Sequence, residues 1–173
     1  MKKIVVTGPE STGKTALAEA LALQLDGHLI PEYARSYVEQ LKRPYNYLDV
    51  EHIARRQARQ EREASAGAAQ GVLVMDTWLI ITKVWFDLVY GRIPGWIDEY
   101  IASTRIDLFL VCQPDLPWIA DSVRENGGEM RLKLLDLYCR EIESYGFAYE
   151  RVEGVGDIRL QNALKQLEAH HLR

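Results

Sequence analysis

One octapeptide near the amino terminus has the spacing of a loop that binds nucleotide phosphates. Residues 8–15 read GPESTGKT and match the pattern G-x-x-x-x-G-K-[ST]. In such loops the backbone N–H groups hold the β-phosphate, the lysine bridges the β- and γ-phosphates, and the final hydroxyl ligates Mg²⁺. A glycine turn that binds nothing would not need the Lys-Thr pair. The residues expected to bind ATP and Mg²⁺ are Gly8, Glu10, Ser11, Thr12, Gly13, Lys14, Thr15 and Ala16.

Two acidic residues follow apolar runs that read as strands. Glu32 comes after residues 28–31, and Asp76 comes after residues 72–75. Each acid alone could be a helix cap. The carboxyl ends of parallel strands are where α/β sheets place their chemistry, so two acids beside a phosphate loop favour catalysis. We expect Glu32 to accept the proton of an attacking hydroxyl and Asp76 to help Thr15 hold Mg²⁺, although the reverse assignment stays open.

Two arginines flank an Asn-Gly-Gly sequence in the region 114–130. Glycines beside arginines are typical of a mobile lid, because a guanidinium must reach the phosphoryl group and then release the product. We therefore predict catalytic roles for Arg124 and Arg131. A surface loop with two ordinary arginines is the alternative.

Apolar strand patterns alternate with helical patterns along the chain. The strand patterns lie at 3–7, 28–31, 72–75, 107–112 and 147–152. The helical patterns begin after residue 13 and recur at 46–69, 76–91, 96–103, 128–145 and 157–170. This alternation predicts a single α/β domain over residues 1–173, with a parallel five-stranded sheet flanked by helices.

Composition argues against several classes of partner. The formal net charge is −4, whereas a nucleic-acid binder usually has a concentrated basic face. Four arginines between residues 55 and 62 are interleaved with acids, including Glu51 four residues before Arg55, so a solvated helix face is favoured over a phosphate site. We expect no nucleic-acid partner.

The apolar and cysteine content gives no sign of a membrane or secreted protein. Charged residues interrupt the long apolar region 72–90, and residues 7–9 end the first apolar run too early for a signal peptide. The two cysteines are too few for a disulfide framework or a metal-site pattern. A cytoplasmic protein without a membrane partner is the expectation.

Motifs of other nucleotide-using proteins are missing from the sequence. Neither D-x-x-G nor N-K-x-D, which GTP-binding switch proteins carry, occurs anywhere. Motor-type ATPases usually place glutamate directly after the strand-end aspartate to polarise water, but Thr77 follows Asp76 here. Water is therefore not the favoured phosphoryl acceptor.

Four stretches together resemble a known family: TGPESTGKT, PEYAR, DTW followed by WFDLVYG, and PDLPWIADSVR. They are similar to the ribosylnicotinamide kinase domain of NadR-type proteins, within the P-loop nucleoside and nucleotide kinases. The likeness spans nearly the whole chain. It implies a P-loop NTPase fold with a mobile lid, and ATP- and Mg²⁺-dependent phosphorylation of the 5′-hydroxyl of nicotinamide riboside to NMN.

The resemblance also implies roles for individual residues. Phosphate binding falls on Gly8, Gly13 and Lys14, and Mg²⁺ on Thr15. Substrate handling falls on Glu32, Arg35 and Asp76, and lid function on Arg124 and Arg131.

The chain departs from the family at two points. NadR-type proteins also carry an adenylyltransferase domain, so we expect NMN adenylylation to come from another protein. The family often has Asp-Thr-Asp after the third strand, where this chain has Trp78 in place of the second acid. A cationic nicotinamide ring needs an aromatic face. The candidates are Trp78 first, then Trp85, Tyr33 and Trp118.

The sequence leaves the acceptor open. Another nucleoside, or a nucleotide, could take the place of nicotinamide riboside. An ATP-binding regulatory module that phosphorylates no small molecule is a third possibility.

Overall fold

The structure is a computed structural model that describes residues 1–67, 71–119 and 126–173. Its centre is a parallel five-stranded sheet in the order β2-β3-β1-β4-β5. The strands are β1 (Lys2–Thr7), β2 (His28–Ile30), β3 (Val72–Asp76), β4 (Leu108–Cys112) and β5 (Tyr149–Val152). This arrangement confirms the predicted fold class.

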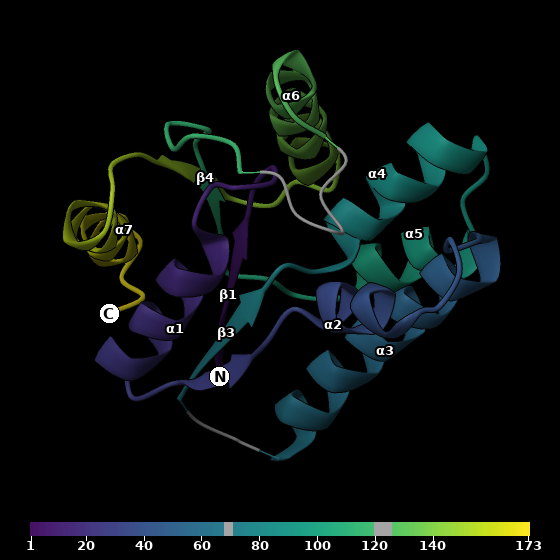
Figure 1. Ribbon diagram of the computed structural model, residues 1–173. Coiled ribbons are helices and arrows are strands. Elements are labelled where there is room, and N and C mark those ends of the chain that lie inside the picture. The colour runs from purple at the N-terminus through teal and green to yellow at the C-terminus, as the bar shows by residue number, and fades with distance from the viewer. Residues whose placement is uncertain (68–70, 120–125) are drawn as a thin grey trace.

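Helices cover both faces of the sheet (Figure 1). The described residues form α1 (Lys14–Gln24), α2 (Tyr33–Gln40), α3 (Tyr47–Gly67), α4 (Leu79–Tyr90), α5 (Gly95–Ser103), α6 (Glu129–Ser144) and α7 (Asp157–Ala169). Alternate residues of β1 point to opposite faces, as a strand requires. Ile4 and Val6 join the core under α1 and α7, whereas Val5 joins the core under α3, α4, α5 and α6.

Most predicted elements lie within two or three residues of their expected positions, but α2 was not predicted. This helix has eight residues, and none of them is buried. Tyr33, Ala34, Tyr37 and Val38 recur at helical spacing, but the pattern is shorter than the roughly 10–12 residues by which sequence analysis tells a helix from other segments. The segment that follows Glu32 is therefore a helix rather than a plain connection.

An asparagine caps the start of α3. The side-chain oxygen of Asn46 accepts hydrogen bonds from the backbone N–H groups of Leu48 and Asp49, at 2.9 and 3.2 Å. The Asp49 carboxylate in turn accepts the backbone N–H of Asn46 at 2.8 Å. This reciprocal pairing satisfies donors that the first turn of a helix otherwise leaves open.

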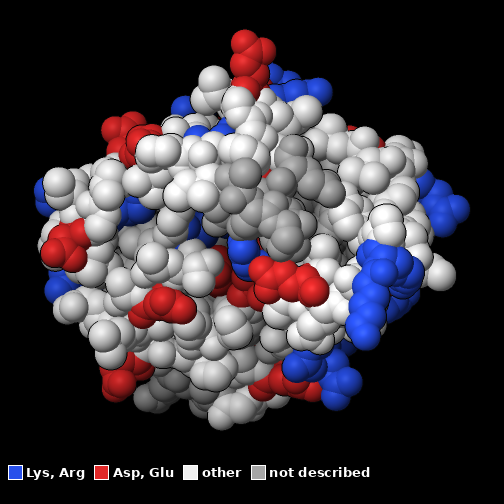
Figure 2. All heavy atoms as spheres, in the orientation of Figure 1, with Lys and Arg blue, Asp and Glu red and all other residues white. Residues whose placement is uncertain are grey.

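Surface charge is mixed on the face that Figure 2 shows, where basic and acidic groups meet near a central hollow. The arginines of α3 have acidic neighbours: Arg55 lies 2.6 Å from Glu51, and Arg59 lies 2.6 Å from Glu63. These pairs agree with a solvated helix face. No helix in the described part of the chain is long and apolar enough to cross a membrane.

The strand order brings the end of β3 next to the end of β1. Val6 is paired with Asp76 in the register of the two strands, and the backbone N–H of Thr77 donates to the carbonyl of Val6 at 2.9 Å. Asp76 therefore lies beside the loop that leaves β1, although the two strand ends, Thr7 and Asp76, are 69 positions apart in sequence.

The loop after β1 passes so close to β4 that its first residue must be glycine. Gly8 has φ +138°, and a Cβ built there would lie 2.6 Å from the carbonyl oxygen of Cys112. Any larger residue would have to move the loop or the end of β4.

We predict that Gly8→Ala lowers the free energy of unfolding by about 2–4 kcal/mol, because it adds both a strained backbone and a clash in a packed region. Urea denaturation would measure the change. Gly95→Ala is the matched control, since a Cβ there meets nothing within 4 Å. Equal midpoints for the two variants would contradict the close approach of the loop to β4.

Candidate active site

Two side chains of the phosphate loop donate hydrogen bonds to the backbone of the same loop. The Thr12 hydroxyl and the Lys14 ammonium both donate to the carbonyl of Pro9, at 2.9 and 2.8 Å. Ser11 and Gly13 have positive φ values of 55° and 73°. The loop then leads directly into α1, whose first residue is Lys14. The N-terminus of a helix with a nearby lysine is a favourable place for a phosphate.

A hydroxyl and a carboxylate meet beside this loop. Thr15 Oγ1 donates to Asp76 Oδ2 at 2.6 Å, and Asp76 is only 2% exposed. Its other oxygen, Oδ1, is buried without a hydrogen-bond partner in the described residues. Burial raises the pKa of Asp76 above its ordinary value. A buried carboxylate oxygen with no donor is a fitting ligand for a cation.

These oxygens fit Mg²⁺. The described ranges contain no group of three or more His, Cys, Asp or Glu that could hold a metal by themselves. Mg²⁺ commonly takes one or two protein ligands and completes its shell with phosphates and water. Thr15 and Asp76 would supply such a partial shell.

A cleft of about 690 Å³ runs from the phosphate loop to helices on the other side of the site. Residues 10–16 line one end of it. The other end takes side chains from α2, the segment before α3, α3 itself, α4 and α6. They include Glu32, Arg35, Tyr45, Gln57, Trp85 and Tyr138. A single cavity can therefore hold a phosphate donor and a second molecule.

Glu32 lies where an acceptor hydroxyl could be placed. It occupies the N-cap position of α2, yet its side chain makes no capping hydrogen bond. Glu32 lines the cleft, together with Arg35 from the first turn of the same helix. A catalytic role for Glu32 stays a prediction.

The aromatic wall of the cleft differs from the one expected. Trp85 lines the cleft and meets Tyr45 edge to face, with ring centroids 4.8 Å apart. Trp78, the first candidate from the sequence, is 2% exposed and packs in the core near Tyr100 and Phe109. Its ring is not available to a molecule in the cleft, which corrects the expectation for Trp78, and a role for Trp85 stays a prediction.

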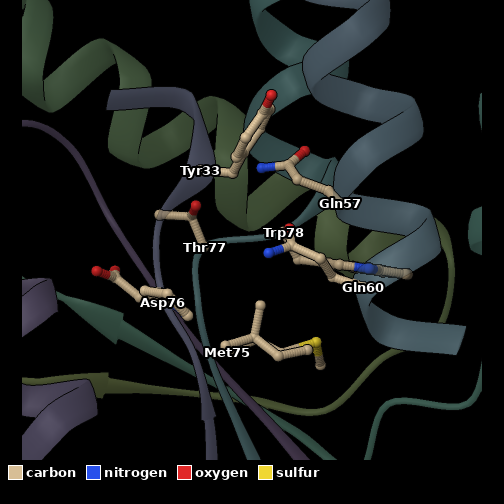
Figure 3. A pocket seen from close by; sticks show the side chains of 9 residues that line it. Tyr33, Gln57, Gln60, Met75, Asp76, Thr77 and Trp78 are labelled. Atoms are coloured by element: carbon tan, nitrogen blue, oxygen red, sulfur yellow. The ribbon is translucent and has the colours of Figure 1, made fainter. Parts of the chain in front are cut away.

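Two further candidate rings lie outside the cleft wall. Tyr33 borders a small adjoining pocket with Gln60 and Met75 (Figure 3), and its hydroxyl lies 3.0 Å from a ring nitrogen of His52. The same view shows the Asp76 carboxylate turned away from the Trp78 ring. Trp118 donates its indole N–H to Glu10 at 3.2 Å.

Of the two predicted lid arginines, Arg124 lies outside the described residues. Arg131 is on the first turn of α6 and is 7% exposed. Its guanidinium donates to the carbonyls of Leu116 and Ser11, at 3.0 and 3.2 Å. Burial lowers its pKa. Here Arg131 fastens α6 to the phosphate loop, and contact with a transferring phosphoryl group remains a prediction.

The strand–loop–helix unit and the strand-end acid together define a P-loop nucleotide-binding protein. The chain belongs to the AAA domain family, whose model matches residues 3–159.

Two curated relatives are NadR proteins, both described as trifunctional NAD biosynthesis/regulator proteins. The Escherichia coli protein is 25% identical over 163 residues, which cover 88% of this chain and 38% of the relative. The Salmonella typhimurium protein is 27% identical over 137 residues, which cover 77% of this chain and 33% of the relative. The chain thus spans about a third to two-fifths of the length of these relatives.

Solved structures share the fold. A NadR protein crystallised in complex with NR matches 98% of this chain and 51% of its own, with a TM-score of 0.81 and 27% identity. A deoxyadenosine kinase from M. mycoides, with dCMP and dCDP bound, matches 96% of this chain and 99% of its own, with a TM-score of 0.66 and 14% identity. At that identity the second match speaks for the fold alone.

The sequence did not single out several residues of the cleft. Tyr45, Gln57, Thr82 and Tyr138 come from three helices and one connection. None of them belongs to a short motif, and each reads as an ordinary helix or loop residue. Only the packing of α3, α4 and α6 around one space brings them together.

We predict that Asp76→Asn weakens the effect of Mg²⁺ on ATP binding, because a neutral amide is a poorer ligand for a hard cation. Calorimetric titration of ATP with and without Mg²⁺ would measure this effect. In the parent protein Mg²⁺ should tighten binding, and in the variant the difference should shrink about tenfold. A full Mg²⁺ effect in Asp76→Asn would remove this residue from the metal site.

Arg131→Ala should lower the free energy of unfolding by about 2–4 kcal/mol, because it removes two hydrogen bonds from a buried charged group. Denaturant titration checks this. Arg140→Ala on the same helix is the control: its exposed pair with Asp136 should matter little. If Arg131→Ala unfolds at the same midpoint as Arg140→Ala, the described contacts of Arg131 contribute no stability.

Proposed function

We propose that this protein transfers the γ-phosphoryl group of ATP to a hydroxyl group of a nucleoside, with the 5′-hydroxyl of nicotinamide riboside as the leading acceptor. The observation that carries the proposal is the single cleft that joins the phosphate loop to Glu32 and to the Tyr45–Trp85 wall. A protein that only hydrolyses ATP does not need space for a second molecule beside its phosphate loop.

The residues divide the reaction between them. Lys14 and the loop N–H groups hold the phosphates, and Thr15 with Asp76 would hold Mg²⁺. When bound, Mg²⁺ neutralises charge on the phosphate oxygens. Glu32 takes the proton from the attacking hydroxyl. The new bond joins that oxygen to the γ-phosphorus, and the bond to the β–γ bridging oxygen breaks, which releases ADP.

The aromatic wall suits a flat cationic ring. A cation over a tryptophan face is worth roughly 0.5–2 kcal/mol, depending on how far it is removed from water. Trp85 is half-buried and offers such a face. The Glu32 carboxylate adds favourable charge in the same chamber. The similarity to a NadR structure that holds NR supports the same acceptor.

Other nucleosides or nucleotides are the second candidate acceptors, because the cleft is large enough for a nucleobase and the fold is shared with a deoxyadenosine kinase and a thymidylate kinase. Arg35 in the cleft would favour an anionic acceptor such as a nucleotide. A regulatory module that binds ATP without an acceptor is the third.

A screen with purified protein, ATP, Mg²⁺ and a panel of nucleosides and nucleotides would test the proposal, with products followed by mass. We expect NMN from nicotinamide riboside, and no product from Lys14→Ala, whose charge-assisted bonds to phosphate are lost. Circular dichroism would check that the variant stays folded. ATP binding without product from any acceptor would favour the regulatory module.

Glu32→Gln should lower the maximal rate by about 10²–10⁴, the usual scale for loss of a general base, with little change in ATP affinity. Steady-state kinetics and calorimetry together would check this. A raised Mg²⁺ requirement in Glu32→Gln, with a normal one in Asp76→Asn, would exchange the roles of the two acids.

A further inference from the structure

A buried amide faces the acceptor end of the cleft. Gln57 lies in the middle of α3, is 7% exposed and lines the cleft. Glutamine is seldom so deeply buried on a helix, because its polar atoms must leave water. Its hydrogen bonds therefore indicate what it does.

Only one end of this amide has a partner within the described residues. The hydroxyl of Thr82 on α4 donates to Gln57 Oε1 at 2.6 Å, and Thr82 is itself buried. The amide nitrogen, Nε2, has no recorded acceptor among the residues described. Figure 3 shows this nitrogen turned toward Tyr33 and the oxygen turned away from it. Thr82 thus fixes which end of the amide faces the space beside Tyr33, and Gln57 borders both the small pocket there and the cleft.

The amide lies close to the aromatic wall. Thr82 and Trp85 are three residues apart on α4, so their side chains share one side of that helix. Both line the cleft, together with Gln57. A flat ring that stacks on Trp85 would then present an edge to the amide of Gln57.

We propose that Gln57 is a specificity-determining residue, whose amide N–H donates to a carbonyl oxygen carried by the ring of the acceptor. Thr82 is the positioning residue that holds the amide in the orientation that this hydrogen bond needs. The inference rests on the proposed function, in which the acceptor occupies this end of the cleft. A ring without such an oxygen would cover the N–H without pairing it, which costs binding.

Nicotinamide riboside and ribosylpyridinium, the same riboside without the carboxamide, form the test pair. Calorimetry without ATP measures the affinity of each, and steady-state kinetics with ATP and Mg²⁺ measures kcat/KM. We expect the parent protein to prefer the carboxamide by about tenfold in affinity, the scale of one hydrogen bond. Gln57→Leu should reduce this preference to within about twofold.

The Thr82 pair separates positioning from packing. Thr82→Val keeps the shape and loses the hydroxyl, so the preference should fall. Thr82→Ser keeps the hydroxyl and should retain it. Gln60→Leu is the control, because Gln60 lies one turn further along α3 and lines the adjoining pocket rather than the cleft.

The outcomes are distinct. An unchanged preference in a folded Gln57→Leu protein would overturn the inference. Should that variant fail to fold, equal preferences in Thr82→Val and Thr82→Ser would overturn it instead. If the protein binds the ribosides with the expected preference but transfers no phosphoryl group, the proposed function is wrong and the role of Gln57 is supported. If the parent protein binds neither riboside, both fail.

Discussion

The hydrogen bond between Thr15 and Asp76 joins the two parts of the chain on which the site depends. Thr15 lies in the first turn of the helix that follows the phosphate loop, and Asp76 ends the neighbouring strand. The bond is short and partly buried, and it fixes the relative position of loop and acid. The buried Asp76 oxygen, which has no partner among the described residues, then points to the place for a cation. The rest of the cleft lies around this Thr15–Asp76 pair.

The strand order separates the two substrates. β1 is central, and the elements that follow β2 and β3 supply Glu32, Gln57 and Trp85 on one side of it. In an in-line transfer the acceptor and the leaving group must lie on opposite sides of the phosphorus. The nucleoside of ATP is therefore expected on the side of β4 and β5. The order of the strands, rather than any single residue, provides this separation.

The parts of the site that depend on a local motif or on the ends of parallel strands could be predicted from the sequence. The phosphate loop is a continuous motif, and Asp76 follows from the rule that strand ends meet at one edge. Trp78 was misplaced because Thr77, a non-glycine residue, adopts a left-handed conformation with φ 66°. That turn sends the tryptophan into the core, and no residue type in the segment signals it.

The cleft wall could not be predicted for a different reason. Tyr45, Gln57 and Trp85 are far apart in sequence and meet only when α3 and α4 pack together. An amphipathic pattern predicts that a helix has a buried side. It does not predict which cavity is lined by the residues between the buried and the exposed side. The residues that select an acceptor thus depend on tertiary packing, whereas those that bind the phosphates depend on a motif.

The edges of the sheet have a consequence for behaviour at high concentration. The edge strands β2 and β5 are the shortest, with three and four residues. β2 begins with the exposed His28, and β5 carries Glu150 and Arg151. An exposed strand edge is a template for pairing with another chain, and short, polar edges offer little to pair with. We expect copies of this protein that meet to associate through their helices, and not by extending one sheet into the next.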